Sequence, residues 1–311
     1  IIFLAIILQV AAIWFLFAMI GIRYVWVDVL FKVAGAVLFF SIINKSKPAV
    51  YKLPWVILIL IAPLMGIVIY YTFGNVKLSK KQMKKFRRIY DEKHDEYYRQ
   101  SDILREMESK GLFGTGSVKY LKNTTSLPVF NNSKTTYLPS GEKFLENLLE
   151  EISKAEKYVF LEYFIIEEGQ MLDAVLKALE EKISQGVKVY FMYDDVGSIA
   201  KVSGSFDKKL REKGINARKF FKFVPIASVI HNNRDHRKIA VIDGKVGFMS
   251  GANIADEYIN VKKPFGRWLD NAVKIQGQAV DNLVRLFIQM YNLTGGETLK
   301  EEDFICLEQQ N

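Results

Sequence analysis

The first 74 residues hold most of the apolar excess of a 311-residue chain in which half of the residues are hydrophobic. Residues 1–22 carry no charge and one strongly polar side chain, Gln9. Their length matches the roughly 20 residues that a helix needs to cross the hydrocarbon core of a bilayer. Backbone polar groups must pair within such a segment, so residues 1–22 are expected to form a transmembrane helix. Further apolar runs at residues 25–43 and 54–73 raise the expected number of spans to two or three.

The third run contains Pro63, which predicts a kink or a broken helix. Residues 77–88 contain seven Lys or Arg residues, against three in the loop before the third run. Positive charge favours the cytoplasmic side, so the larger cluster and the part of the chain after it are expected there, in a multi-pass membrane protein. The smaller basic loop would then lie outside, which leaves the number of spans open. The cluster is also suited to attract anionic lipid.

The rest of the chain has the charged, amphipathic pattern of a soluble fold. Residues 80–110 are expected to form a long surface helix or a pair of helices, ended by three glycines between residues 111 and 116. A domain boundary is therefore expected near residue 118. The expected division is a membrane segment, a basic helical linker and a catalytic domain: residues 1–74, 75–117 and 118–311.

Strand and helix patterns alternate after this boundary. Ser140 is expected to cap a helix that runs to Lys154, with an apolar stripe along its buried side. A buried strand over residues 158–166 precedes a helix over 170–185 and a strand over 187–193. This order predicts an α/β domain with a largely buried sheet. The remaining expected elements are strands at residues 135–138 and 273–275 and a helix over residues 279–291.

The stretch from Asn232 to Asn253 has the pattern of a β-hairpin. Residues 238–242 are mostly apolar, Asp243-Gly244 is a favoured two-residue turn, and residues 246–250 form the returning strand. A tight turn would bring Asn253 back beside the residues that enter the hairpin.

His236 and Lys238 stand two residues apart at the entry of this hairpin, so their side chains are expected on the same face, with Arg237 on the opposite face. With Asn253 they would place an imidazole, an ammonium and a carboxamide around one point. Such a set suits a phosphate group and contains a potential nucleophile. The alternative is that these are ordinary polar residues at the mouth of a hairpin.

The spacing of these residues extends into a longer motif. His236, Lys238 and Asp243 form the pattern H-x-K-x4-D, and Gly251 and Asn253 follow it. This motif resembles the signature of the phospholipase D superfamily. The resemblance implies a sandwich in which helices flank a mixed sheet, preceded here by transmembrane helices.

Other stretches extend the resemblance, although Ser250 stands where the signature has its first glycine and could crowd the phosphate loop. Residues 51–74 resemble the membrane segment that precedes the catalytic part of bacterial cardiolipin synthases. LEYFIIEEG at residues 161–169, YDDVGSI at 193–199 and FGRWLD at 265–270 are similar to runs of those enzymes.

The resemblance implies a mechanism without metal or cofactor. His236 would attack phosphorus and form a phosphohistidine, although the sequence leaves open whether it acts as nucleophile or general acid. Lys238, Asn253 and Gly251 would bind the substrate phosphate, and Asp243 would orient or charge-balance an imidazole. One phosphatidylglycerol would lose its glycerol, and a second would take the phosphatidyl group to give cardiolipin.

Two further carboxylates are expected to support the site. Glu162 lies in a buried strand, where a carboxylate is costly unless it has a partner. One alternative is a structural role, either at an edge position in the sheet or in a salt bridge to a helix. The other alternative, which the resemblance implies, is a supporting group close to the active site. Asp270 in the FGRWLD run has the same implied place. Asp194 and Asp195 stand at the carboxyl end of their strand, where the active-site loops of α/β domains usually lie, but they could equally cap the following turn, and this structural role is favoured.

Family members usually carry a second H-x-K-x4-D motif, whereas this chain has one. Neither His94 nor His231 has a Lys two residues later, and a metal site built from His231 and His236 lacks suitably spaced carboxylates. The chain is therefore expected to need a second catalytic half, either from a missing C-terminal domain or from another chain, and to be inactive alone.

Two alternatives to phosphatidyl transfer stay open. One is a dimeric phosphodiesterase or nuclease, which the net charge of +9 favours. That charge is concentrated beside the membrane segment, and no aromatic-interleaved basic patch is present, so nucleic acid is not an expected partner. The other is a catalytically silent module that binds acidic membrane lipids.

Overall fold

The structure is a computed structural model that describes residues 24–74, 101–125, 127–222, 234–264 and 266–305, together with Phe15, Met19 and Lys84. Contacts divide the chain into two units, residues 1–78 with 225–233 and residues 79–224 with 234–311. The predicted span over residues 1–22 lies outside the described residues except for Phe15 and Met19, and so do His94 and His231.

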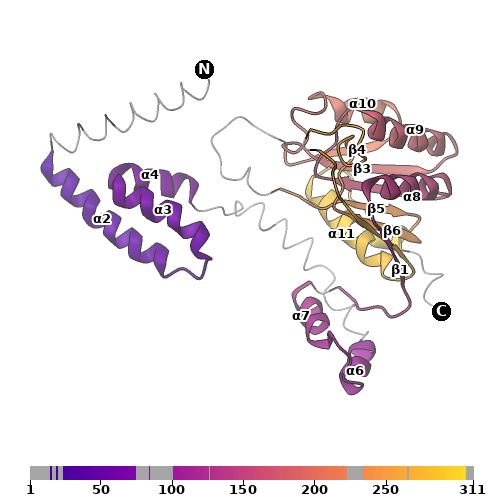
Figure 1. Ribbon diagram of the computed structural model, residues 1–311, viewed down its shortest axis with the longest axis horizontal. Coiled ribbons are helices and arrows are strands. Elements are labelled where there is room, and N and C mark those ends of the chain that lie inside the picture. The colour runs from indigo at the N-terminus through magenta and orange to yellow at the C-terminus, as the bar shows by residue number, and fades with distance from the viewer. Residues whose placement is uncertain are drawn as a thin grey trace. The chain divides into compact units, whose positions relative to one another are not determined.

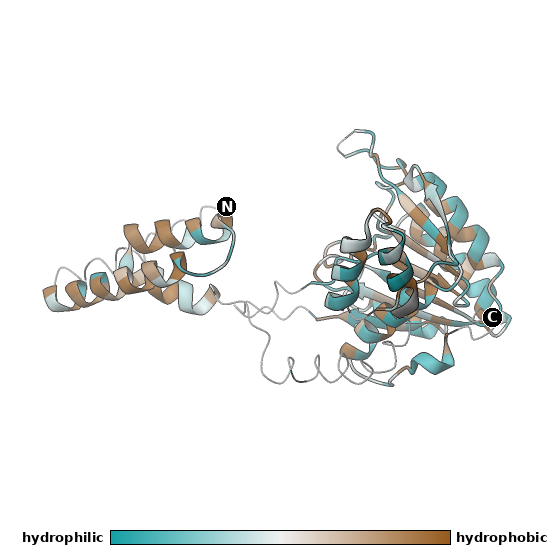
Figure 2. Ribbon diagram, turned by 90° about the horizontal axis from the view of Figure 1, so that it is seen from below, coloured by the Kyte–Doolittle hydropathy of each residue, from teal (hydrophilic) through white to brown (hydrophobic). Residues whose placement is uncertain are grey.

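The described part of the first unit contains the apolar helices α2 (Val25–Ile43), α3 (Ala49–Ile61) and α4 (Pro63–Phe73), which Figure 2 colours mostly as hydrophobic. Among the described residues, only α2 is long and apolar enough to cross a membrane. The apolar run at residues 54–73, counted among the two or three expected spans, does not form a span, because the helix breaks at Ala62 and the pieces of 13 and 11 residues are too short. Multiple passes are therefore not supported within the described residues.

The helices α3 and α4 fold back on each other as a hairpin (Figure 1). Pro63 stands at the first position of α4, where its missing N–H leaves no hydrogen bond unmade. A Cβ at Gly66 would lie 2.7 Å from the Cα of Ile59, so glycine permits the close approach of the two helices. The break that Pro63 predicted is confirmed, and its consequence is a reversal of chain direction.

The second unit is built on a seven-stranded mixed sheet with the order β1-β7-β6-β5-β2-β3-β4. The strands β2, β3 and β4 are parallel, while β5, β6, β7 and β1 pair antiparallel. Their bounds are β1 (Lys134–Leu138), β2 (Tyr158–Tyr163), β3 (Lys188–Asp194), β4 (Asn216–Phe220), β5 (Ile239–Ile242), β6 (Val246–Ser250) and β7 (Ala272–Gln276).

Helices cover both faces of this sheet (Figure 1). On one face, α8 (Gly141–Ser153), α9 (Gln170–Ser184) and α10 (Phe206–Glu212) share a core with strand residues such as Leu161 and Ala240. On the other face, α11 (Val280–Leu293) packs on Phe160 and Val241. The predicted sandwich of a mixed sheet flanked by helices is therefore confirmed. The remaining elements are α6 (Ser101–Ser109), α7 (Thr115–Thr125) and a 3-10 turn, η3 (Glu301–Asp303).

Most predicted elements of this unit are confirmed within a few residues. The Ser140 hydroxyl caps α8 by accepting a hydrogen bond of 3.3 Å from the backbone N–H of Lys143. The strand predicted over residues 158–166 ends earlier, at Tyr163. Gly116 lies inside α7 and does not end a helix, and β4 occupies a stretch for which no strand was predicted.

Candidate functional site

One end of the sheet gathers the residues that surround His236. Because β5 runs antiparallel to β2, the residues that enter β5 lie beside the residues that leave β2. The chain also leaves β6 and enters β7 at this end, since Ser250 pairs with Ala272. The segments around His236, Phe164, Gly251 and Asp270 are thus brought together by the strand pairing, although they are far apart in sequence.

His236 and Lys238 lie on the same side of the chain. The imidazole contacts the ring of Phe164 with the ring centroids 4.7 Å apart, and Lys238 Nζ lies 5.5 Å from the centroid of that ring. On the opposite face, Ile239 and Val241 pack in the core beneath α11. The alternation expected from the sequence is confirmed.

Lys238 is a buried cation at the edge of this site. The residue is 6% exposed, and its Nζ donates a hydrogen bond of 2.7 Å to the backbone oxygen of His236. Burial lowers the pKa of Lys238, while the carboxylates of Asp235 and Asp270 act in the opposite direction. A buried ammonium with unused N–H donors is suited to hold an anionic oxygen next to the imidazole.

His236 is exposed, in contrast to Lys238. Partial desolvation of the imidazole lowers the pKa of His236, and the charge of Lys238 lowers it further, against opposing effects of Asp235 and Asp194. The imidazole is therefore mainly neutral near pH 7, which is the form that can attack an electrophile.

Replacing Lys238 by Gln is expected to raise the pKa of His236 toward its ordinary value, because a positive charge beside the imidazole is removed. Proton NMR titration of the imidazole signals measures this, and His236→Asn identifies the resonance. Lys245→Gln, at the far end of the hairpin, is the matched control and is expected to leave the titration unchanged. Equal titration curves for the wild type and Lys238→Gln would contradict the electrostatic coupling of the pair.

Asn253 holds the loop after β6 against the segment after β2. It is 2% exposed; its Oδ1 accepts from the backbone N–H of Ile165 at 2.9 Å, and its Nδ2 donates to Tyr258 Oη at 2.7 Å. The amide nitrogen has a second N–H, for which the described residues provide no partner. Because Ile165 follows Phe164 directly, Asn253 reaches the segment that His236 and Lys238 also contact.

Gly251 is required by the close approach of Asp270. A Cβ at Gly251 would lie 2.2 Å from Asp270 Oδ1. The other oxygen of Asp270 accepts a hydrogen bond of 3.1 Å from Trp268 Nε1. Ser250 stands where the motif has its first glycine. Its hydroxyl donates a hydrogen bond of 2.8 Å to the backbone oxygen of Ala252.

Asp243 lies at the opposite end of β5 from His236, so the predicted role in orienting or charge-balancing an imidazole is corrected for this chain. Its carboxylate accepts hydrogen bonds from three consecutive backbone N–H groups at 2.7, 2.8 and 2.8 Å, those of residues 156–158. Asp243 and Gly244 both have positive φ, 54° and 67°, as expected for the predicted turn. Asp243 therefore joins the hairpin turn to the start of β2.

Glu162 lies on the face of the sheet that α11 covers, paired with Arg237. Arg237 Nε is 2.7 Å from Glu162 Oε1 and 3.1 Å from Asp235 Oδ1. Neither oxygen of Glu162 accepts a hydrogen bond of good geometry. Burial raises the pKa of Glu162, and Arg237 opposes this. Glu162 thus reaches the site only through Arg237 and Asp235, which flank His236 in sequence.

Several residues of the site were not singled out from the sequence, namely Phe164, Asp235, Arg237 and Tyr258. Asp235 and Arg237 could have been suspected as charged neighbours of His236, but Phe164 and Tyr258 depend on strand pairing. Asp194 caps the turn after β3 through the N–H groups of Val196 and Gly197, the structural role that was favoured. No group of three His, Cys, Asp or Glu side chains suited to a metal occurs among the described residues.

The sequence matches two families over separate ranges. Residues 148–290 match the family described as "Cardiolipin synthase, PLD-like domain", and residues 33–75 match "Phospholipase_D-nuclease N-terminal". A protein of Streptococcus mutans is 34% identical over 261 residues, covering 84% of this chain and 56% of that protein. "Cardiolipin synthase 2" of Staphylococcus epidermidis is 32% identical over 246 residues, covering 76% and 50%.

The chain spans about half the length of the curated relatives it matches. Among solved structures, NucT from Helicobacter pylori is 18% identical with a TM-score of 0.40, covering 53% of this chain and 100% of that chain.

Proposed function

We propose that this chain, which belongs to the phospholipase D superfamily, supplies one His–Lys pair of a phosphatidyltransferase site that makes cardiolipin from two phosphatidylglycerol molecules. The observation that carries the proposal is the exposed imidazole of His236 beside the buried ammonium of Lys238, both against the ring of Phe164. Relatives named as cardiolipin synthases support the choice of substrate.

The first step is the attack of a His236 ring nitrogen on the phosphorus of phosphatidylglycerol. An N–P bond forms while the P–O bond to the glycerol headgroup breaks, and the departing alkoxide takes a proton from a general acid. Lys238 and the second N–H of Asn253 bind the non-bridging oxygens. Their contribution is electrostatic, since phosphodiesters resist attack mainly through the negative charge on these oxygens.

The second step reverses the first with a different alcohol. A hydroxyl of a second phosphatidylglycerol attacks phosphorus, the N–P bond to His236 breaks, and the hydroxyl proton passes to the group that acted as acid. One cardiolipin and one glycerol are produced, and both catalytic groups return to their starting protonation states. Division into two displacements lowers the barrier of each.

The general acid must lie on the side of phosphorus opposite His236, because the nucleophile and the leaving group are in line. His236 is the one histidine among the described residues. Neither His94 nor His231 has a Lys two residues later, and we assign the acid to a second phospholipase D-like half, in another domain or another chain. The exposed side of His236 leaves room for such a partner.

The proposal includes attachment to a membrane, since the substrate is a lipid and α2 is a candidate span. The catalytic unit follows the basic run of residues 77–88, so we assign it to the cytoplasmic side of a bacterial cell membrane.

The test is lipid analysis by mass spectrometry after the chain is incubated in vesicles of phosphatidylglycerol and phosphatidylcholine, with and without a second phospholipase D-like domain. Cardiolipin and glycerol in equal amounts, dependent on the second domain or on the surface density of the chain, are expected. Phosphatidic acid without cardiolipin would identify a hydrolase. Cleavage of added DNA without lipid products would favour a nuclease. Lipid binding without turnover would favour a catalytically silent module.

A further inference from the structure

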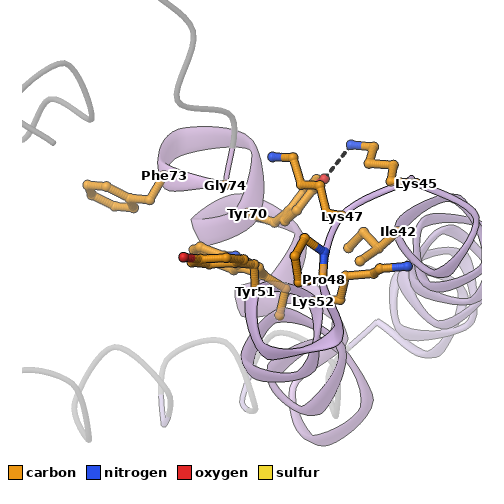
Figure 3. Close-up of a pocket in the computed structure, with 10 residues that line it drawn as sticks. Ile42, Lys45, Lys47, Pro48, Tyr51, Lys52, Tyr70, Phe73 and Gly74 are labelled. Atoms are coloured by element: carbon orange, nitrogen blue, oxygen red, sulfur yellow. Dashed lines mark hydrogen bonds between the residues drawn. The ribbon is translucent and has the colours of Figure 1, made fainter. Parts of the chain in front are cut away.

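A pocket of about 470 Å³ lies in the first unit, between the loop that joins α2 to α3 and the end of α4 (Figure 3). Lys45 and Lys47 reach it from the loop between α2 and α3, and Lys52 from the first turn of α3. Tyr70 and Gly74 line it from the end of α4. No residue of the candidate catalytic site lines this pocket.

The reversal at Ala62 creates this pocket, because it returns the end of α4 to the start of α3. Trp55 and Tyr70 meet edge to face, with their ring centroids 5.5 Å apart. A continuous helix over this stretch would have placed Tyr70 far from Lys45. Instead, Lys45 Nζ donates a hydrogen bond of 2.6 Å to Tyr70 Oη, the dashed line in Figure 3.

The charge of the pocket is positive and is not balanced by the unit itself. None of Lys45, Lys47 and Lys52 forms an ion pair with a described residue. Lys52 Nζ donates to the backbone oxygen of Ile43 at 2.7 Å, and Lys45 to a phenol, so each ammonium keeps further N–H donors. The single acidic residue in the sequence of this unit is Asp28, which pairs with Lys32 at 2.6 Å.

Exposed apolar and aromatic side chains surround the pocket. The outer faces of the helices carry exposed apolar side chains such as Val37 and Leu60, as expected for contact with acyl chains. Tyr51 and Phe73 at the pocket are 67% and 37% exposed, in the pattern of aromatic residues at a membrane interface. Lysine side chains together with apolar and aromatic side chains line the pocket. This combination suits a phosphodiester joined to acyl chains better than a free ion.

We infer that this pocket binds the anionic headgroup of a membrane phospholipid, with Lys45, Lys47 and Lys52 holding its phosphate. The inference goes beyond the proposed function and does not rest on it. Gly74 lines the pocket at the end of α4, and the basic run of residues 77–88 follows it in the sequence. On this inference both basic groups are assigned to one side of the membrane, which differs from the expectation that the smaller basic loop lies outside.

The test is native mass spectrometry of the full chain in non-ionic detergent, titrated with phosphatidylglycerol or phosphatidylcholine. The wild type is expected to retain one phosphatidylglycerol adduct preferentially. Lys45→Gln/Lys47→Gln/Lys52→Gln is expected to lower that affinity by roughly tenfold or more and to leave phosphatidylcholine binding unchanged. The matched control, Lys80→Gln/Lys81→Gln/Lys84→Gln, removes the same charge from the basic run of residues 77–88 and is expected to have a much smaller effect.

A charge-conserving variant, Lys45→Arg/Lys47→Arg/Lys52→Arg, shows whether loss of binding reflects loss of charge or of the fold. It is expected to retain most of the preference for phosphatidylglycerol. Equal losses in the two Gln triplets would overturn the pocket in favour of diffuse attraction to anionic lipid. Displacement of the lipid by inorganic phosphate at comparable concentration would overturn the assignment to a lipid.

Discussion

Replacement of His236 by Asn is expected to lower the rate of cardiolipin formation by at least about 10⁴-fold, because the group that forms the bond to phosphorus is removed. Asn preserves polarity and approximate size at an exposed position, so the fold is expected to be unchanged. The measurement is the initial rate of product formation in phosphatidylglycerol vesicles, with the second half supplied.

The other two histidines provide matched controls for this substitution. His94→Asn and His231→Asn make the same chemical change outside the H-x-K-x4-D motif. Both variants are expected to keep activity within a few-fold of the wild type. A His236→Asn protein that retains substantial activity, or a loss of equal size in either control, would remove His236 from the role proposed for it.

Asp243→Ala is expected to produce a large loss of stability in the catalytic unit, about 3–5 kcal/mol in the free energy of local opening. The carboxylate accepts three short hydrogen bonds from backbone N–H groups, and the residue is 6% exposed. Its removal leaves these donors unsatisfied at the start of β2. Hydrogen exchange of the amides of residues 156–158, followed by mass spectrometry, measures the effect.

Two companion variants separate this structural role from a chemical one. Asp243→Asn keeps one acceptor oxygen and tolerates the positive φ, so it is expected to lose only part of the stability. Lys245→Ala changes a half-exposed residue of the same turn, whose contact with Glu156 is 3.9 Å, and is expected to cost at most about 0.5 kcal/mol. Loss of turnover in folded Asp243→Asn protein would restore the catalytic role.

The sequence predicts those parts of the catalytic unit that depend on local pattern. The alternation around His236 and Lys238 sets which side chains share a face, and Asp243-Gly244 sets the turn. Ser140 and the apolar stripe after it likewise define α8. In each case neighbouring residues carry the information, so the structure differs from the expectation only at the element ends.

Roles that depend on distant partners could not be predicted in the same way. Asp243 belongs to the motif by spacing, yet its hydrogen-bond partners lie more than 80 residues earlier in the chain. The buried position of Glu162 predicted that its carboxylate has a partner. The sequence did not indicate that this partner is Arg237, which lies within the motif itself. Pairing of β2 with β5 determines both arrangements, and a single sequence does not display that pairing.

The membrane unit shows the same limit. Composition marks residues 54–73 as apolar, and Pro63 marks a break, but neither tells whether the chain continues across the bilayer or reverses. The chain reverses, and Gly66 permits the close approach of α4 to Ile59 in α3. With this reversal we assign the basic loop before α3 and the basic run of residues 77–88 to the same side of the membrane. A three-span arrangement would place them on opposite sides of it.

The central claim is that His236 carries the phosphatidyl group between two alcohols. The most direct measurement is to incubate the chain and its second half with phosphatidylglycerol that bears radiolabelled phosphate, stop turnover with alkaline denaturant, and map the label by peptide mass spectrometry. We expect a phosphatidyl adduct on His236 that disappears when unlabelled phosphatidylglycerol is added before the stop. Cardiolipin formation without any adduct on His236, or with the adduct on another residue, would contradict it.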